Sequence, residues 1–473
     1  MARAVWMTPS RASASSFAFA STSASSSPRR EFHVAPMRDY TDRHHRRLTR
    51  LLTRESTLWS EMEKARAILR AADTSDRKLS RLLRRGSPGG REVLQLGGDD
   101  PDAVGAAAAL ALDFDYSEIN LNCGCPAVET GGGDFGASLM RDPSRTAAVI
   151  AAIHRVADPR GVPISVKCRV GVAETADDVV PEGASHDEIE AALAAPLRSF
   201  VLACVDAGAR GVVLHCREAV MAGLSPRANR DAPPLRPELA ARLARELRGE
   251  RDERTDERTS RTSRTFRTFR TSRTSRTSPS LVVPVPVPVT LNGGISSIAE
   301  ASDAVTRAPE LAGVQVGRWA LRKPLDMLAV DAGFYGGDAR ADGRLGLGDV
   351  DAAVDAVESY VYRYAVRELE TGEASLGALA RPLALVLADA DERANAADDR
   401  EEAAAAEAVA RATLSCFGAL AEGGRGGGGE RDERKLRRAL AKAVGKKVAG
   451  KQRGARAEAA SAANRRWSAN GTP

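Results

Sequence analysis

The 473-residue sequence predicts an α/β fold, a (β/α)8 TIM barrel followed by a C-terminal helical domain. Short apolar runs alternate with longer helix-like stretches from residue 32 to residue 317, and this alternation is typical of a parallel sheet. Eight runs over that length fit a (β/α)8 barrel, for which ~250 residues is typical. From Asp349 onward the apolar runs stop and helix-like stretches remain, so a helical domain follows the barrel.

The predicted strands are short and apolar, and the second along the chain has the weakest pattern. In chain order the eight are Phe32–Met37, Leu58–Met62, Val93–Gly97, Glu118–Asn122, Pro163–Val170, Gly211–His215, Val287–Asn292 and Gly313–Gly317. The helices predicted among them are Asp42–Arg54, Asp102–Leu112, Arg145–Val156, His186–Ala207, Pro237–Glu250 and Ser297–Arg307. The C-terminal helices are Asp349–Glu370, Leu376–Ala394 and Glu401–Leu420.

The positive charge of the chain, formally +6, lies in three segments. Residues 1–30 hold four Arg and no acid, residues 251–280 hold nine Arg against four acids, and residues 430–467 hold thirteen Lys or Arg against four acids. The remaining chain is therefore acidic, and a basic tail on an acidic body can deliver it to a polyanion. The predicted domains are a leader at 1–30, a barrel at 31–335, a helical domain at 346–445 and a basic disordered tail at 446–473.

Residues 1–30 have the composition of an organelle transit peptide, with nine Ser, seven Ala, four Arg and no acid. We expect an organellar location, and the Ser and Ala richness favours a plastid over a mitochondrion; a chain without a targeting leader would be cytoplasmic. No apolar run approaches the ~20 residues needed to span a membrane, so no membrane segment is predicted. The six Cys include no C-x-x-C pair, which indicates neither a disulfide framework nor a metal site.

Residues 251–280 form a near-perfect triplet repeat, mostly Arg-Thr-Ser. Nothing in the repeat can bury a core, so we interpret it as a disordered insertion in a barrel loop. An RNA-binding arm is one reading of this segment. A repeat expansion or a mistranslated intron is the favoured one.

All eight predicted strands end in a polar or glycine-bearing motif, and the chemistry of a barrel lies at those ends. The motifs are Ala-Pro-Met-Arg-Asp (35–39), Ser-Glu-Met (60–62), Gln-Leu-Gly-Gly (95–98), Asn-x-Gly-Cys-Pro (122–126), Lys-x-Arg (167–169), His-x-Arg (215–217), Asn-Gly-Gly (292–294) and Gly-Arg (317–318). Burial gives no reason for eight such motifs in succession, so together they predict an active site.

The last two motifs predict a phosphate site, because loops after strands seven and eight of a barrel often bind one. Asn292, Gly293 and Gly294 let backbone amides approach an anion. Gly317 adds a close backbone approach, and Arg318 adds a charge.

Lys167 and His215 lie on late strands and are expected to point inward, where an unpaired cation or imidazole is costly. An electron-rich planar ring with a phosphate tail would supply partners for both, and the carboxamide of Gln95 can pair two atoms on a ring edge. Cys125 stands between Gly124 and Pro126, so its loop is fixed. We expect it to act as a proton donor or nucleophile, with Cys123 the next candidate.

These residues together resemble the flavin-dependent tRNA-dihydrouridine synthases. The matching segments are FHVAPMRDYTDRHHRRLTRLLTRESTLWSEM (32–62), LQLGGDDP (94–101), INLNCGCP (119–126), FGASLM (135–140), VKCRVG (166–171), HCREAVMAGLSPRANRDAPPL (215–235), LNGGI (291–295) and VGRWALRKP (316–324). The Gly-Leu-Ser-Pro-x-x-Asn-Arg stretch and the Asp-x-Thr-Asp-Arg-His opening resemble the A-type subfamily. The resemblance covers about residues 31–330.

The resemblance implies that FMN, reduced by NADPH or NADH, gives hydride to C6 of a D-loop uridine in tRNA, while Cys125 donates a proton to C5 on the other face. It implies flavin contacts at Pro36, Met37, Arg38, Gln95, Lys167 and His215, and phosphate contacts at Asn292, Gly293, Gly294, Gly317 and Arg318. For tRNA it implies Asn122 at the base, Arg227 and Arg230 in a contacting loop, and Arg434, Lys435, Arg437 and Arg438 on a basic helix. A monomer with tRNA as partner is expected.

Two other functions fit parts of the pattern. One is an FMN-dependent TIM-barrel oxidoreductase of a free small molecule, which leaves Arg227, Arg230 and the basic C-terminal segment unexplained. The other is a catalytically weakened tRNA-binding protein. Ala-Val-Glu-Thr at 127–130, where A-type enzymes usually read Ser-Asp-Arg, allows it, whereas Cys125, Lys167 and His215 argue against it. The stretch after Met62 also departs from the family pattern.

Overall fold

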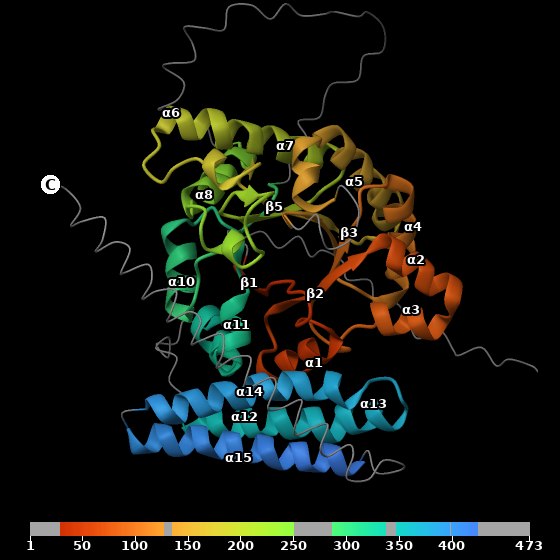
Figure 1. Cartoon of the computed structure of the whole chain (residues 1–473), viewed down its shortest axis with the longest axis vertical. Helices are drawn as coiled ribbons and strands as arrows, with labels where there is room; N and C mark the ends of the chain where they lie inside the picture. The colour runs from red at the N-terminus through yellow and green to blue at the C-terminus, as the bar shows by residue number, and fades with distance from the viewer. Residues whose placement is uncertain (1–28, 127–134, 250–285, 337–346, 398, 424–473) are drawn as a thin grey trace, which may run out of the picture.

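The computed structural model describes residues 29–126, 135–249, 286–336, 347–397 and 399–423. Its centre is a closed barrel of eight parallel strands surrounded by helices, with a layer of long helices packed on one side (Figure 1). The order around the barrel is β1-β10-β9-β7-β5-β4-β3-β2, which confirms the predicted (β/α)8 fold. The barrel strands are β1 (Glu31–Val34), β2 (Thr57–Lys64), β3 (Glu92–Gly97), β4 (Glu118–Cys123), β5 (Ile164–Arg169), β7 (Gly211–His215), β9 (Val289–Asn292) and β10 (Gly313–Val316).

Several helices around the barrel begin where a side chain caps them. Asp42 accepts hydrogen bonds from the backbone N–H groups of His44 and His45, both at 2.9 Å, and starts the first helix. Ser297 and Asp100 start later helices in the same way. These helices are α1 (Arg43–Leu52), α2 (Ala65–Thr74), α3 (Asp76–Leu83), α4 (Pro101–Ala111), α5 (Pro143–Ala157), α6 (His186–Ile189), α7 (Ala195–Asp206), α8 (Pro237–Leu247), α10 (Ile298–Arg307) and α11 (Arg318–Arg322).

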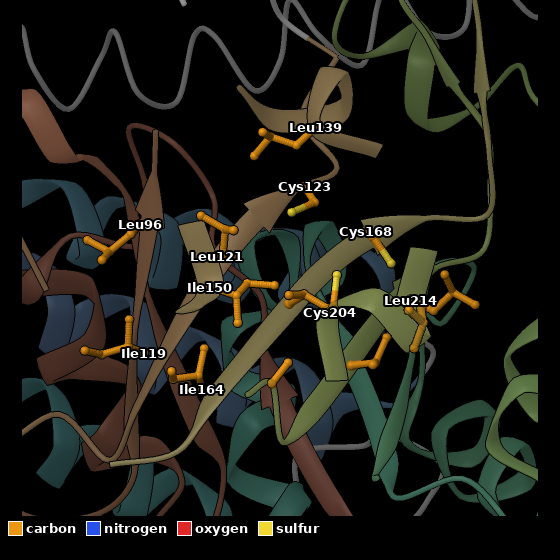
Figure 2. Packing of buried hydrophobic residues seen from close by; sticks show 14 of the residues in the cluster. Leu96, Ile119, Leu121, Cys123, Leu139, Ile150, Ile164, Cys168, Cys204 and Leu214 are labelled. Carbon is orange, nitrogen blue, oxygen red and sulfur yellow. The ribbon is translucent and has the colours of Figure 1, made fainter. Parts of the chain in front are cut away.

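The main core lies between the barrel strands and the helices outside them. Leu94, Leu121 and Val166 are fully buried there, and they pack with Ile150 of α5 and Cys204 of α7. Figure 2 shows this layer, including the sulfur atoms of three buried cysteines among aliphatic side chains. Because successive side chains of a strand face opposite ways, the residues between these apolar positions point into the barrel.

The barrel interior is unusually polar. Gln95, Asn120, Ser165 and Gln315 are each at most 3% exposed, and they come from four different strands. Buried polar groups of this kind are stable only when they are hydrogen-bonded. Gln95, Asn120 and Ser165 meet this requirement through side-chain hydrogen bonds, whereas neither polar atom of the Gln315 side chain has a hydrogen-bond partner among the described residues.

The C-terminal helices form a bundle with a core of its own. They are α12 (Leu347–Tyr360), α13 (Val366–Glu370), α14 (Leu376–Ala396) and α15 (Arg400–Gly423), and a π-helical segment, Val361–Ala365, joins the first two. Leu383, Val409 and Phe417 lie in this core, which also reaches Leu48 of α1. One segment of α15, Arg400–Leu420, is long and apolar enough to cross a membrane by length and composition, but 44% of its most apolar window is buried inside the protein.

The structure adds elements that the sequence did not predict. Residues after Met62 form the helices α2 and α3, and a two-stranded sheet joins β6 (Val172–Ala173) to β8 (Ala219–Val220) beside the barrel mouth. Residues 1–28 of the predicted leader at 1–30, the insertion at 251–280, the acidic stretch after Pro126 and the basic tail lie outside the described residues.

Candidate active site at the carboxyl ends of the barrel strands

Cys125 lies in a loop that backbone hydrogen bonds hold in place. Its N–H and the N–H of Gly124 both donate to the Asn122 side-chain oxygen, at 3.0 and 3.1 Å. Its carbonyl accepts the N–H of Ala137 at 2.9 Å, and Gly136 lies so close that any Cβ there would collide with this carbonyl. The thiol is thus carried by a fixed backbone at the end of β4.

Cys125 is the partly exposed cysteine of the described chain, because the other five are buried. Burial raises the pKa of the Cys123 thiol well above its usual value and raises that of Cys168 to about 12. Figure 2 shows Cys123, Cys168 and Cys204 directed into the apolar core. The structure therefore places Cys123 away from any accessible chemistry and leaves Cys125 at the barrel mouth.

A continuous line of hydrogen bonds runs along the inside of the barrel to this loop. Asn122 donates to Gln95 at 2.8 Å, and Gln95 donates to Asn120 at 2.8 Å. Asn120 donates to the hydroxyl of Ser165 at 2.7 Å, and that hydroxyl donates to the carboxylate of Glu118. We call these five side chains the amide line. Every donor in it points the same way, so the Glu118 carboxylate polarises the line towards Asn122.

A cluster of cations lies at the ends of β5, β7 and β10. The cation cluster comprises Lys167, Arg169, Arg217, Arg230 and Arg318. Burial, with the charge of Arg169, lowers the pKa of Lys167 to about 8, and burial with neighbouring charges lowers that of Arg169 to about 9. Among the described residues, the carboxylate that pairs with this cluster is Asp231, which lies 2.5 Å from Arg318. Five cations around one carboxylate create a site that favours an anion.

His215 stands within this cluster and is 8% exposed. Burial, and to a lesser extent the charges of Arg169 and Lys167, lower the pKa of its imidazole well below the ordinary value. The ring is therefore neutral at pH 7, when it can both donate and accept a hydrogen bond. Lys167 donates to the side-chain oxygen of Asn292 at 3.1 Å, which fixes its ammonium group beside the same strand end.

The turn after β9 makes a cradle that only glycine allows. Gly293 has a φ of 114° and Gly294 a φ of 80°, both in the left-handed region. A Cβ on Gly293 would lie 2.9 Å from the His215 ring, and one on Gly294 would lie 2.5 Å from Leu235. Bare backbone can therefore face the cation cluster. The arrangement fits the phosphate group predicted from these motifs.

The loop after β1 borders the mouth next to the end of β10. Pro36 and Met37 are half-buried, and Arg38 is exposed. The hydroxyl of Thr41 accepts the N–H of Met37 at 2.9 Å, and Asp39 takes a left-handed φ of 66° in the same turn. The Met37 sulfur would lie 3.5 Å from a Cβ built on Gly317, so this loop and the β10 end meet.

The predicted tRNA-contacting residues divide between described and undescribed parts. Arg227 and Arg230 lie in the exposed loop after β8, and the backbone of Arg230 accepts a bond from Arg318 at 3.4 Å. The side-chain oxygen of Asn122 accepts the N–H of Cys125, and one N–H of its side-chain amide donates to Gln95. The second N–H of that amide remains available to a ligand. Arg434, Lys435, Arg437 and Arg438 lie outside the described residues.

Several residues of the site were not singled out from the sequence. Arg169 and Arg217 were visible within the Lys-x-Arg and His-x-Arg motifs, because alternate residues of a strand share a face. Ser165 and Asn120 gave no signal of their own, since each matters through a partner on the neighbouring strand. Met62 was also missed, although its sulfur lies against Gly97. In the described parts of the chain, no group of three or more metal-ligating side chains occurs.

The chain is similar to a family described as dihydrouridine synthase (Dus), whose pattern matches residues 33–238. The tRNA-dihydrouridine(20/20a) synthase of Xanthomonas campestris pv. campestris is 36% identical over 308 residues, covering 65% of this chain and 72% of that protein. The protein of the same name from Xanthomonas axonopodis pv. citri is 36% identical, over 63% of this chain and 70% of its own length. The one from Pseudomonas putida is 32% identical over 66% and 74%. Morphinone reductase, a solved structure, aligns at 11% identity over 64% of this chain and 86% of its own, with a TM-score of 0.37.

Proposed function

The chain belongs to the dihydrouridine synthase family, and we propose that it is an A-type tRNA-dihydrouridine synthase that reduces the C5–C6 bond of D-loop uridines in tRNA. Relatives at 32–36% identity over about two thirds of the chain carry that name, with positions 20 and 20a. The observation that carries the proposal is the pairing of one accessible thiol, Cys125, with a cation-rich cradle at the same barrel mouth.

The residues at the mouth fit FMN as cofactor. The cation cluster and the glycine cradle offer one anion site, which suits the single phosphate of a mononucleotide. The half-buried Pro36 and Met37 offer an apolar edge for a flat ring. We assign ring contacts to Pro36, Met37, Arg38, Gln95, Lys167 and His215, and phosphate contacts to Asn292, Gly293, Gly294, Gly317 and Arg318. When bound, FMN reduced by NADPH or NADH supplies the hydride for C6 of the uracil ring.

The chain's own residues supply the proton and the positioning. Cys125 donates its thiol proton to C5 of the base and regains it from solvent afterwards. Asn122 offers its free N–H to a carbonyl of the base, because its oxygen already accepts two backbone N–H groups. The target base has to leave the RNA stack to reach a barrel mouth, and the surrounding loops have to hold it there.

Contacts outside the mouth account for tRNA as substrate rather than a free pyrimidine. Arg227 and Arg230 provide exposed positive charge beside the mouth. We extend the helical tRNA-binding domain to 346–445, including Arg434, Lys435, Arg437 and Arg438, with the basic tail at 446–473 behind it. A small-molecule oxidoreductase would need none of this charge. The protein acts as a monomer in this scheme.

Three measurements test the function. The purified chain should be yellow and release FMN rather than FAD. With NADPH it should form dihydrouridine in unmodified tRNA but not in free uridine. Sequencing dihydrouridine in tRNA from cells that lack the protein identifies the position. A colourless protein that FMN cannot reconstitute, or reduction of the free nucleoside alone, would contradict the proposal.

We also propose that residues 1–30 direct the protein to an organelle, a plastid before a mitochondrion. The proposal rests on the nine Ser, seven Ala and four Arg of that segment and its lack of acids. A fluorescent protein fused behind residues 1–30 should enter the organelle. Fluorescence spread through the cytoplasm would argue against a targeting role.

A further inference from the structure

The seam between the barrel and the helical bundle holds a cavity, and none of the residues that line it belongs to the candidate active site. Its volume is about 550 Å³. Its walls come from α3 on the barrel side and, on the bundle side, from α13 and the π-helical segment Val361–Ala365 that precedes it. In Figure 1, α3 and α13 face each other at one edge of the molecule. The seam arginines Arg77, Arg84, Arg363 and Arg367 line it.

Arg77 and Arg84 are already paired with acids of the seam, and each of those acids also pairs with a second arginine. Glu368 is 8% exposed and accepts from Arg84 at 2.6 Å and from Arg43 at 2.7 Å. Glu373 pairs with Arg77 at 3.0 Å and with Arg81 at 3.7 Å. Each carboxylate thus pairs with two guanidinium groups, so neither acid neutralises the other arginines of the cavity.

The guanidinium groups of Arg363 and Arg367 make no hydrogen bond or ion pair with a described residue. They are four residues apart on one helical stretch, so they share a face, and like charges at that spacing repel. Counting Arg43 and Arg81, six guanidinium groups surround two carboxylates at one cavity. The hydroxyl groups of Ser80 and Thr371 also line it and can donate hydrogen bonds.

We propose that this seam cavity is a phosphate-binding site that joins the barrel to the helical bundle. Guanidinium forks match the paired oxygens of a phosphate, and hydroxyl donors fit its remaining oxygen. The volume lies within the ~300–1,000 Å³ of small-ligand sites, and the charge excess selects for an anion rather than a neutral ligand. The phosphate belongs either to the backbone of bound tRNA or to a free phosphorylated molecule. The first alternative rests on the proposed function, and the second does not.

The test compares R363A, R367A and the double variant with R411A in the full-length holoprotein. Arg411 is an exposed arginine of the same bundle, paired with Glu407, so its variant makes the same change of charge away from the seam. Arg363 and Arg367 are exposed and form no ion pair with a described residue, so their removal should leave the melting temperature and the yellow colour unchanged.

Two readouts distinguish the sources of the phosphate. In a salt series of tRNA affinity, backbone binding predicts that each seam variant lowers the log–log slope by about one unit, while R411A does not. In a thermal melt at constant ionic strength, a free ligand predicts that inorganic phosphate raises the melting temperature of the wild type but not of the double variant. Either result supports the site.

The proposal would be overturned if the seam variants had the same salt-dependence slope for tRNA binding as R411A and the same phosphate-induced shift in melting temperature. Wild-type dihydrouridine formation, measured alongside, separates this failure from a failure of the proposed function. If the wild type forms dihydrouridine while the seam variants match R411A in both readouts, only the proposed seam site is contradicted. If the wild type forms no dihydrouridine, the effect of phosphate on the melting temperature still tests the seam site.

Discussion

At the residue scale, we propose that a single thiol supplies the proton. Cys125 is partly exposed on a braced loop, whereas Cys123, two residues before it, is fully buried in the core. C125A should keep FMN and tRNA binding but lose dihydrouridine formation by ~10²–10⁴-fold, the usual cost of a missing general acid. Single-turnover assays with pre-reduced enzyme check this.

The matched control for that variant is C123A, which changes a core residue. It should retain turnover with a modest loss of stability. Near-normal turnover of C125A together with a defective C123A would show that the other thiol is the proton donor.

The charge of Lys167 gives a pH dependence with a defined sign. Burial lowers its pKa to about 8, so it loses its proton as the pH rises through that value. An anion binds the protonated form better, and the affinity of the cofactor-free protein for FMN should therefore fall as the pH rises above about 8. The free energy of unfolding of the cofactor-free chain should change the other way, rising between about 8 and 10.5, because the unfolded state holds that proton more tightly.

Quenching of FMN fluorescence across a pH series that brackets 8 measures the affinity. K167Q should bind FMN more weakly and lose most of the dependence. His215 cannot supply the same transition, because its pKa lies well below the ordinary value. A dependence that survives in K167Q would assign the titration to another group.

At the scale of elements, the amide line links Glu118, at the start of β4, to the loop of Cys125. S165A removes the acceptor of the buried Asn120 and the donor to the half-buried Glu118. We expect a loss of about 1–3 kcal/mol in the free energy of unfolding. We also expect a lower kcat with an unchanged KM for tRNA, because the loop of Cys125 loosens while the RNA contacts stay.

Alkylation of Cys125 separates positioning from a general loss of stability. The other described cysteines are buried, so iodoacetamide reports on this thiol, and S165A should react faster than the wild type. S165T restores the hydroxyl and should restore the rate. T290V alters another buried interior residue outside the line and should leave it unchanged. Equal alkylation rates in S165A and the wild type would remove Ser165 from the positioning role.

Elements also show how far the sequence alone reaches. The eight strands were predictable because apolar runs and strand-end motifs are local in sequence. The amide line was not, because Gln95 meets Asn120, and Asn120 meets Ser165, only through the pairing of β3, β4 and β5. Helices α2 and α3 were missed because their stretch is rich in Arg and departs from the family pattern. The seam could not be anticipated, since Arg84 and Glu368 lie 284 residues apart.

At the scale of the whole molecule, the charged segments divide into one that we expect to bind RNA and one that we expect to be passive. Residues 430–467 hold thirteen Lys or Arg against four acids, and residues 251–280 hold nine Arg against four acids. Removing 430–473 should weaken tRNA binding and flatten its salt dependence by about one log–log unit per lost phosphate contact. Removing 251–280 should lower affinity only slightly.

The second deletion also tests the barrel itself. An Arg-Thr-Ser repeat has no apolar face to bury, so its loss should leave FMN binding and the melting temperature unchanged. The insertion falls between α8 and β9, and both flanking elements keep their own core contacts through Leu243 and Val289. Melting both holoproteins and measuring tRNA affinity over one salt series compares the deletions directly. An unfolded 251–280 deletion would make that segment structural, and an unchanged slope without 430–473 would make the tail a solvated surface.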